Sequence, residues 1–222
     1  MGFTQTYDSG SEINISFPAI DLILGKSYVT LLAGIVTTSK FLRTFTFDSD
    51  SAGVYDTGTC AEGGEVDGVD NDFDIEFGEN RTIEGEAIIN GTLVLGKAPA
   101  TGGNVGFWKI EVLIRKWDGS TETEIASATT TELQPTITAA DSPFPFKWGV
   151  NIDIPKTTIK KGESLRITTL FKSRNWTSPA PDFTFPHSPS NQAYDDVAGV
   201  DYLDWGSIGS VLKCFIPFKV PR

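Results

Sequence analysis

The chain has 222 residues, of which 39% are hydrophobic and 21% charged, and its formal net charge at pH 7 is -11. This composition is that of a globular protein and argues against a disordered tail, while the length allows one large β domain or two small ones. The acidic balance repels phosphate, so we expect no direct nucleic-acid binding. No apolar run approaches the length of a membrane span, and residues 1–5 lack the features of a signal peptide, so neither membrane insertion nor export is expected.

Alternating apolar and polar residues predict strands through the first part of the chain. The pattern occurs over 13–17 and 41–47, with side chains of one parity pointing to one face. Residues 28–35 are apolar on both parities, which predicts a strand covered on both faces, with a short helix as the alternative. The sequence also permits an arm over 1–17 that reaches a neighbouring subunit. The next segment, 48–71, is rich in Asp and Gly and has few large apolar residues, which predicts a long acidic surface loop.

The middle of the chain contains the clearest hairpin. Alternation resumes over 73–77 and 83–95, where Asn90-Gly91 marks either a hairpin turn or a bulge within one long strand. Residues Phe107–Ala128 then predict a half-buried strand, a turn at Asp118-Gly119 and a more polar returning strand.

Three further strands are predicted in the last part of the chain. They cover 146–154, ended by Pro155, then 165–171 and 212–218, and a long Pro-rich loop spans 173–205. The total is about eight to ten strands and no long amphipathic helix. We therefore predict an all-β protein, an antiparallel β-sandwich of jelly-roll type with long loops. It is taken as a single domain over 1–222, although a separate N-terminal domain stays open.

Part of the acidic loop resembles a calcium-binding loop. Carboxylates at Asp48, Asp50 and Asp56 have partly the right spacing, but Ala52 replaces one donor and Thr59 stands where a bidentate Glu belongs. A second acidic cluster consists of Asp67, Asp70, Asp72 and Asp74. Because the ligand set is incomplete, a solvated acidic loop is the favoured interpretation and calcium binding is the alternative; no other cofactor is predicted.

No catalytic signature is present in the sequence. The single histidine, His187, is not accompanied by a G-x-S-x-G nucleophile motif, so the chain is predicted not to be an enzyme. Cys60 and Cys214 have unrelated spacings that give no zinc motif, and their pairing in a disulfide stays open.

The aromatic residues divide into two groups. Trp108 and Trp148 lie on the apolar parity of their strands and are predicted to be core residues. Four others lie at turns or in loops and are predicted to make subunit contacts or to stack on a glycan: Trp117, Trp176, Tyr202 and Trp205.

Four stretches between Phe107 and Val220 resemble virion proteins of tailed double-stranded DNA viruses. They are FWKIEVLIRKWDGSTETEIASATT, FKWGVNIDIPKTTIKKGESLRIT, FPHSPSN and CFIPFKV. The third is similar to a loop written His-Asp-Pro-x-Asn, with Ser188 in place of the Asp. The resemblance implies a β-sandwich of the kind found in decoration, turret, fibre and minor capsid proteins.

The function expected on these grounds is that of a structural protein located in the virion, assembling as a homo-oligomer. The expected partners are other copies of the chain, as a homotrimer, and the major capsid protein or other virion proteins. The alternative is a carbohydrate-binding module of a host-recognition fibre. A polysaccharide-degrading enzyme is the third and least favoured class.

Overall fold

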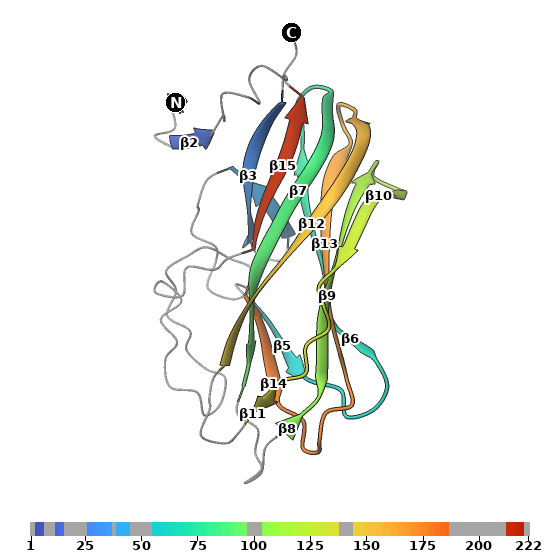
Figure 1. Ribbon diagram of the computed structural model, residues 1–222. Helices are drawn as coiled ribbons and strands as arrows, with labels where there is room; N and C mark the ends of the chain where they lie inside the picture. The colour runs from blue at the N-terminus through green and yellow to red at the C-terminus, as the bar shows by residue number, and fades with distance from the viewer. Residues whose placement is uncertain are drawn as a thin grey trace.

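The computed structural model describes residues 3–6, 12–15, 26–36, 39–44, 55–96, 104–137, 144–186 and 212–219. Within these residues the regular secondary structure consists of strands alone, which confirms the all-β prediction (Figure 1). No helix in these parts of the chain is long and apolar enough to cross a membrane.

The strands are β1 (Phe3–Thr6), β2 (Glu12–Ile15), β3 (Lys26–Val36), β4 (Ser39–Arg43), β5 (Tyr55–Thr59), β6 (Val66–Glu76), β7 (Arg81–Leu95), β8 (Asn104–Val105), β9 (Phe107–Trp117), β10 (Glu122–Thr129), β11 (Thr136–Ile137), β12 (Phe144–Ile159), β13 (Ser164–Arg174), β14 (Asp182–Pro186) and β15 (Lys213–Lys219).

Most of these strands belong to one hydrogen-bonded sheet. Its order is β10-β9-β13-β6-β4-β3-β15-β7-β14-β5, and β12 pairs with β7 beside this path. Every pairing in the sheet is antiparallel except that of β4 with β6, which is parallel and has one register pair, Phe41 with Asp74. The sheet therefore consists of two antiparallel groups, β10-β9-β13-β6 and β4-β3-β15-β7-β14-β5 with β12, joined at a narrow seam.

The two groups pack their apolar faces against each other. Trp108 of β9 meets Phe146 of β12 with ring centroids 5.5 Å apart, and Phe171 of β13 meets Phe183 of β14 at 4.5 Å. Both strand groups contribute to a single buried core. The hydrogen-bonded path thus folds over into two layers, a sandwich, as two-residue alternation with one apolar face requires.

The central hairpin predicted from the sequence is confirmed. β9 and β10 pair from Glu122 with Trp117 to Thr129 with Glu111, with a bulge at Ile125. Gly119 has φ 95°, which an L-residue rarely adopts. The Asp118 carboxylate accepts hydrogen bonds from the backbone N–H groups of Ser120 (2.9 Å) and Thr121 (2.7 Å). These two hydrogen bonds favour the charged carboxylate and hold the pKa of Asp118 below its ordinary value.

We expect Asp118→Ala to lower the melting temperature at pH 7 and to have a smaller effect in acid. A carboxyl group with a lowered pKa in the folded state stabilises the fold above its unfolded-state pKa. That stabilisation disappears as the pH falls through the lower, folded-state pKa. Thermal unfolding from pH 7 to pH 2 measures this, with Thr123→Ala as the control. An equal loss at every pH would contradict the hydrogen-bond explanation.

Two sequence expectations about strand ends are settled by the long β7–β12 pair. Asn90-Gly91 lies within β7, which continues to Leu95 without a turn, and Gly91 leaves room for the Trp148 ring. Pro155 does not end β12, contrary to the prediction: the strand passes a bulge between Ile154 and Thr157 and continues to Ile159. A bulge tolerates proline because it leaves one residue outside the ladder.

The predicted loops are shorter than expected where the structure describes them. The stretch 48–71 contains β5 and the start of β6, and 173–205 contains β14, so describing either as one long loop is wrong. The described strands also exceed the predicted eight to ten, because pieces as short as β8 carry too few residues to show a period. In the predicted arm 1–17, β1 pairs with β2. Cys60 and Cys214 are free and buried, and burial raises the pKa of both thiols.

Candidate functional site: a charged sheet face

The outer surface of β6, β13, β9 and β10 carries an ordered array of charged side chains. Along β6 the core parity is Val69, Asn71 and Phe73, which turns the intervening aspartates outward. On β13 the same alternation buries Ile167 and leaves Arg166 on the outside. We call this surface the charged face; it consists of Asp67, Asp70, Asp72, Asp74, Lys109, Glu111, Arg115, Glu122, Arg166 and Lys172.

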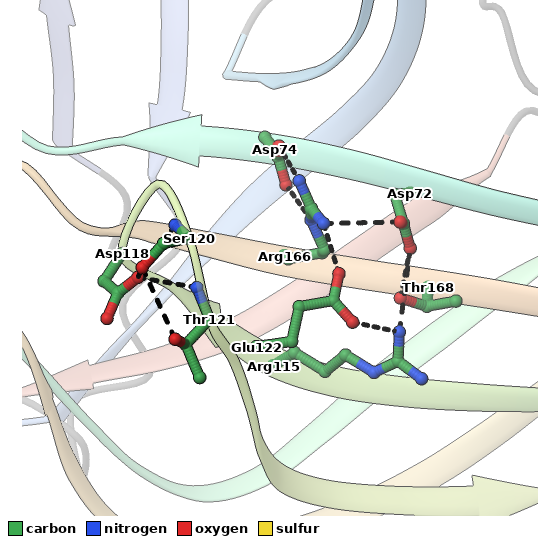
Figure 2. Close-up of polar contacts among 9 residues, drawn as sticks. All are labelled: Asp72, Asp74, Arg115, Asp118, Ser120, Thr121, Glu122, Arg166 and Thr168. Carbon is green, nitrogen blue, oxygen red and sulfur yellow. Dashed lines mark hydrogen bonds and ion pairs between the residues drawn. The ribbon is translucent and has the colours of Figure 1, made fainter.

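At one end of the charged face, several carboxylates surround Arg166 (Figure 2). Its Nε and Nη2 each donate a 2.7 Å hydrogen bond to one carboxylate oxygen of Asp74, a bidentate contact. Its Nη1 contacts Glu122 and lies 3.4 Å from Asp72 Oδ2. The guanidinium carbon is 4.6 Å from the centroid of the Trp117 ring. Its side chain is only 13% exposed, so water weakens these contacts less than on an open surface.

The remaining charges join the same network or form a second group. Arg115 donates to Glu122 at 2.9 Å and lies 4.0 Å from Asp72, which also accepts a hydrogen bond from Thr168 at 2.5 Å. At the other end of the face, Lys172 pairs with Glu111 at 2.7 Å and lies 3.8 Å from Asp67. The hydrogen bond with Glu111 raises the pKa of Lys172.

Asp70 lies between these two groups and differs from the other carboxylates. Its pKa is raised, mainly by desolvation and then by the negative charge of Asp72. Within the described part of the chain it takes part in no ion pair, and its register partner on β13 is Leu170. The charged face therefore keeps one surplus carboxylate, which is in no ion pair with the described residues and whose charge is disfavoured by desolvation and by Asp72.

The structure places one of the three predicted calcium residues. Asp48 and Asp50 lie outside the described residues, and Asp56 lies in β5 rather than in a loop, which corrects the calcium-loop assignment. Its carboxylate accepts a 2.6 Å hydrogen bond from Asn71 Nδ2 and lies 3.6 Å from Lys40 Nζ. The second acidic cluster is on strand β6, where Asp72 and Asp74 share Arg166. Asp67 lies near Lys172, and Asp70 takes part in no ion pair among the described residues. No group of three metal-ligating side chains occurs among the described residues.

The aromatic residues predicted to lie on the surface differ in their burial where the structure describes them. Trp117 is half-buried at the end of β9 beneath Arg166. Trp176 is 2% exposed, so its assignment to a subunit or glycan surface is wrong. Its backbone N–H donates to Ala61 O at 3.0 Å, and this hydrogen bond helps to fix the segment that carries the ring against Gly106. Tyr202, Trp205 and His187 lie outside the described residues.

The charged face was not identified from the sequence. A strand pattern is present in VDNDFD, where Val69, Asn71 and Phe73 alternate with aspartates. It is hard to recognise because Asn71, although buried, is polar. The cations that complete the face come from strands far along the chain, Arg166 being 92 residues from Asp74.

Comparison with known proteins gives a fold but no family. No protein-family model and no curated protein matches the chain. Among solved structures, an aminopeptidase from the marine sediment archaeon Thaumarchaeota archaeon is 8% identical, with a TM-score of 0.50 over 96% of this chain and 39% of that one. An α-amino acid ester hydrolase is 9% identical, with a TM-score of 0.50 over 87% and 36%. A CocE/NonD family hydrolase from Staphylococcus aureus is 10% identical, with a TM-score of 0.48 over 98% and 41%.

The matches to the aminopeptidase and the ester hydrolase correct the prediction that the chain is not an enzyme. The fold occurs within hydrolases, so neither the strand pattern nor the missing nucleophile motif excludes an enzyme. The chain spans about two fifths of the length of these hydrolases. Matches to infectious bursal disease virus structures, among them its VP2 subviral particle, have TM-scores of 0.14 to 0.16 and carry no argument.

Proposed function

We propose that the charged face is an assembly surface and that the chain is a structural subunit of a virus particle. In this proposal the face binds a basic surface on a neighbouring copy, as in a homotrimer, or on the major capsid protein. The observation that carries the proposal is the surplus carboxylate at Asp70, which lies between two ordered ion-pair groups. The virion setting is supported by the four sequence stretches that resemble virion proteins.

The arrangement suits recognition of a charged partner. Side chains already held by hydrogen bonds lose little freedom on binding, and complementary charge speeds encounter and rejects wrong partners. Arg166 and Arg115 are held in this way by Asp74 and Glu122. Unpaired carboxylates are costly in the free chain, and a partner cation would relieve that cost.

The test compares Asp70→Lys with Asp153→Lys, an equal charge change at an exposed position of β12. Self-association is measured by sedimentation velocity, and attachment by co-sedimentation with particles of the virus that encodes the chain. We expect Asp70→Lys to weaken binding by roughly tenfold or more, about 1.4 kcal/mol, and Asp153→Lys to leave it unchanged. Wild-type chain that stays monomeric and does not sediment with particles would contradict the proposal.

Asp70→Asn is expected to stabilise the chain at pH 7 while weakening the same binding. A raised pKa means that the charged carboxylate destabilises the fold above its unfolded-state pKa. Removing the charge therefore raises the melting temperature at neutral pH, and the gain disappears as the pH falls below that value. Thermal unfolding at pH 7 and pH 3 measures the gain. A loss of stability at pH 7 would show that Asp70 has a favourable partner in the free chain.

A second candidate is a β domain that works with or within a hydrolase, favoured by the fold shared with the aminopeptidase and the ester hydrolase. The test measures hydrolysis of an α-amino acid ester and of an aminoacyl anilide by the chain. Each assay is run with the chain alone and with the proteins encoded next to it. Turnover that depends on this chain would favour the hydrolase and count against the virion proposal.

A further inference from the structure

A second polar group lies at the junction of β4 and β6, separate from the charged face; its Lys40 and Asp56 side chains are 25% and 36% exposed, and its Asn71 is buried. It consists of Lys40 on β4, Asp56 on β5 and Asn71 on β6. Asn71 is 1% exposed, and its neighbours of the same parity on β6 are the core residues Val69 and Phe73. Its register partner on β13, Thr169, is fully buried. The amide therefore lies where bulk water has little access.

The two ends of the Asn71 amide contact two different charged groups. Lys40 Nζ contacts Oδ1, which places the lysine nitrogen beside the carbonyl carbon Cγ. Nδ2 donates a 2.6 Å hydrogen bond to Asp56 Oδ2, and that same oxygen lies 3.6 Å from Lys40 Nζ. An amine is thus held at the carbonyl, and a carboxyl group is held at the nitrogen that would leave. The carboxyl group also reaches the amine.

We propose that Lys40 and Asn71 form an intramolecular isopeptide bond between Nζ and Cγ, with Asp56 transferring protons. The ammonium group of Lys40 gives one proton to the Asp56 carboxylate, and the free amine adds to Cγ. Asp56 then protonates Nδ2, and the Cγ–Nδ2 bond breaks. Nζ loses a further proton, so one ammonium ion leaves for each amide formed. No oxidant, nucleotide or metal is required, because an amide is exchanged for an amide.

The surroundings explain why the amine rather than water would attack. The contact between Nζ and the amide replaces an encounter in solution by a fixed geometry, which raises the effective concentration of the nucleophile. The apolar neighbours on β6 limit hydrolysis of the same carbonyl group. A carboxyl group in hydrogen-bond reach of the leaving nitrogen can act as general base and then as general acid.

The bond would strengthen the seam of the sheet. β4 and β6 form the parallel junction between the two antiparallel groups, and they share one register pair, Phe41 with Asp74. Lys40 and Asn71 lie on these two strands, 31 residues apart in sequence. A covalent link there closes a loop in the unfolded chain and prevents the two groups from separating at their weakest hydrogen-bonded junction.

Mass spectrometry of the purified wild-type chain tests the bond directly. We expect the intact, denatured protein to be lighter than its sequence mass by one ammonia. Trypsin should leave residues 27–43 and 44–81 joined as one branched species, uncleaved after Lys40. A full-mass chain with ordinary cleavage after Lys40 would overturn the proposal, as would ammonia loss located at another Asn.

Variants separate the chemistry from folding. We expect an unlinked chain from each of three variants: Lys40→Arg, Asn71→Asp and Asp56→Ala. The matched control, Asn151→Asp, should still form the bond. Asn151 also donates to a carboxylate, Glu86, but it lies on an exposed strand position. Folding of each variant is checked by circular dichroism. Where a variant does not fold, the test depends on the mass measurement of the wild-type chain described above. Linked chains should melt roughly 10 °C higher than folded, unlinked variants. A folded Asp56→Ala chain that links as fully as wild type would overturn the role of Asp56.

Discussion

Replacing Arg166 with methionine should lower the free energy of unfolding by about 3 kcal/mol, because it leaves several carboxylates without their shared cation. Asp74 loses a bidentate partner, and Glu122 and Asp72 lose a second contact. Methionine keeps part of the aliphatic stem but removes the guanidinium, whose carbon lies 4.6 Å from the Trp117 ring centroid, so the loss reports the charge and its cation–π contact together. Urea unfolding followed by tryptophan fluorescence measures the change, with the midpoint falling while the slope stays constant.

Arg81→Met is the matched control for this prediction. Arg81 pairs with Glu79 at 2.6 Å, but both side chains are more exposed, at 40% and 68%. Exposed pairs contribute little because water and salt screen them, so we expect a change below about 0.5 kcal/mol. Equal effects of the two substitutions would show that the Arg166 network does not contribute more to stability than an ordinary surface pair.

The strands that the sequence predicts best are those in which apolar residues recur at alternate positions. β9 and β13 have this pattern, and the Asp118-Gly119 turn gives β9 its partner by a local signal. β5 and β6 do not have it, because Asn71 interrupts the apolar parity and Asp and Gly dominate the rest. A strand with polar residues at buried positions is predicted as a loop, because the two-residue pattern is recognised from hydrophobicity alone.

The interacting side chains could not be predicted in the same way. Cross-strand contacts depend on register, and register between distant strands is set by packing of the whole core rather than by any local motif. Arg166 meets Asp74, and Lys40 meets Asn71, only because β13 and β4 both lie beside β6. Each strand shows its own faces in the sequence but carries no local signal that identifies its neighbour.

Trp176 shows the same limit for a single aromatic residue. The polar and proline-rich residues around it predict a surface loop, yet its ring lies on Gly106 in the core. Backbone hydrogen bonds hold the segment there: Asn175 donates to Gly63 O at 2.7 Å, and Thr177 donates to Val105 O at 2.9 Å. The ring therefore stabilises the contact between two chain segments instead of offering a binding surface.

Truncating this ring should cost as much as losing a large core residue. We expect Trp176→Ala to lower the free energy of unfolding by about 3–5 kcal/mol, because it removes a large buried side chain and leaves a cavity. Filling the opposite side should also destabilise the fold: a Cβ at Gly106 would lie 2.2 Å from Trp176 Cδ2, so Gly106→Ala should cost about 2 kcal/mol. Urea unfolding at pH 7 measures both.

Two substitutions of the same chemistry provide the comparison. A Cβ added at Gly64 meets no atom within 4 Å, so Gly64→Ala should leave stability within about 0.5 kcal/mol of wild type. Trp117→Ala should cost less than Trp176→Ala, because Trp117 is half-buried and its main contact is with the Arg166 guanidinium. If Trp176→Ala and Gly106→Ala were both neutral, the ring would not occupy the core, and a surface role for Trp176 would have to be restored.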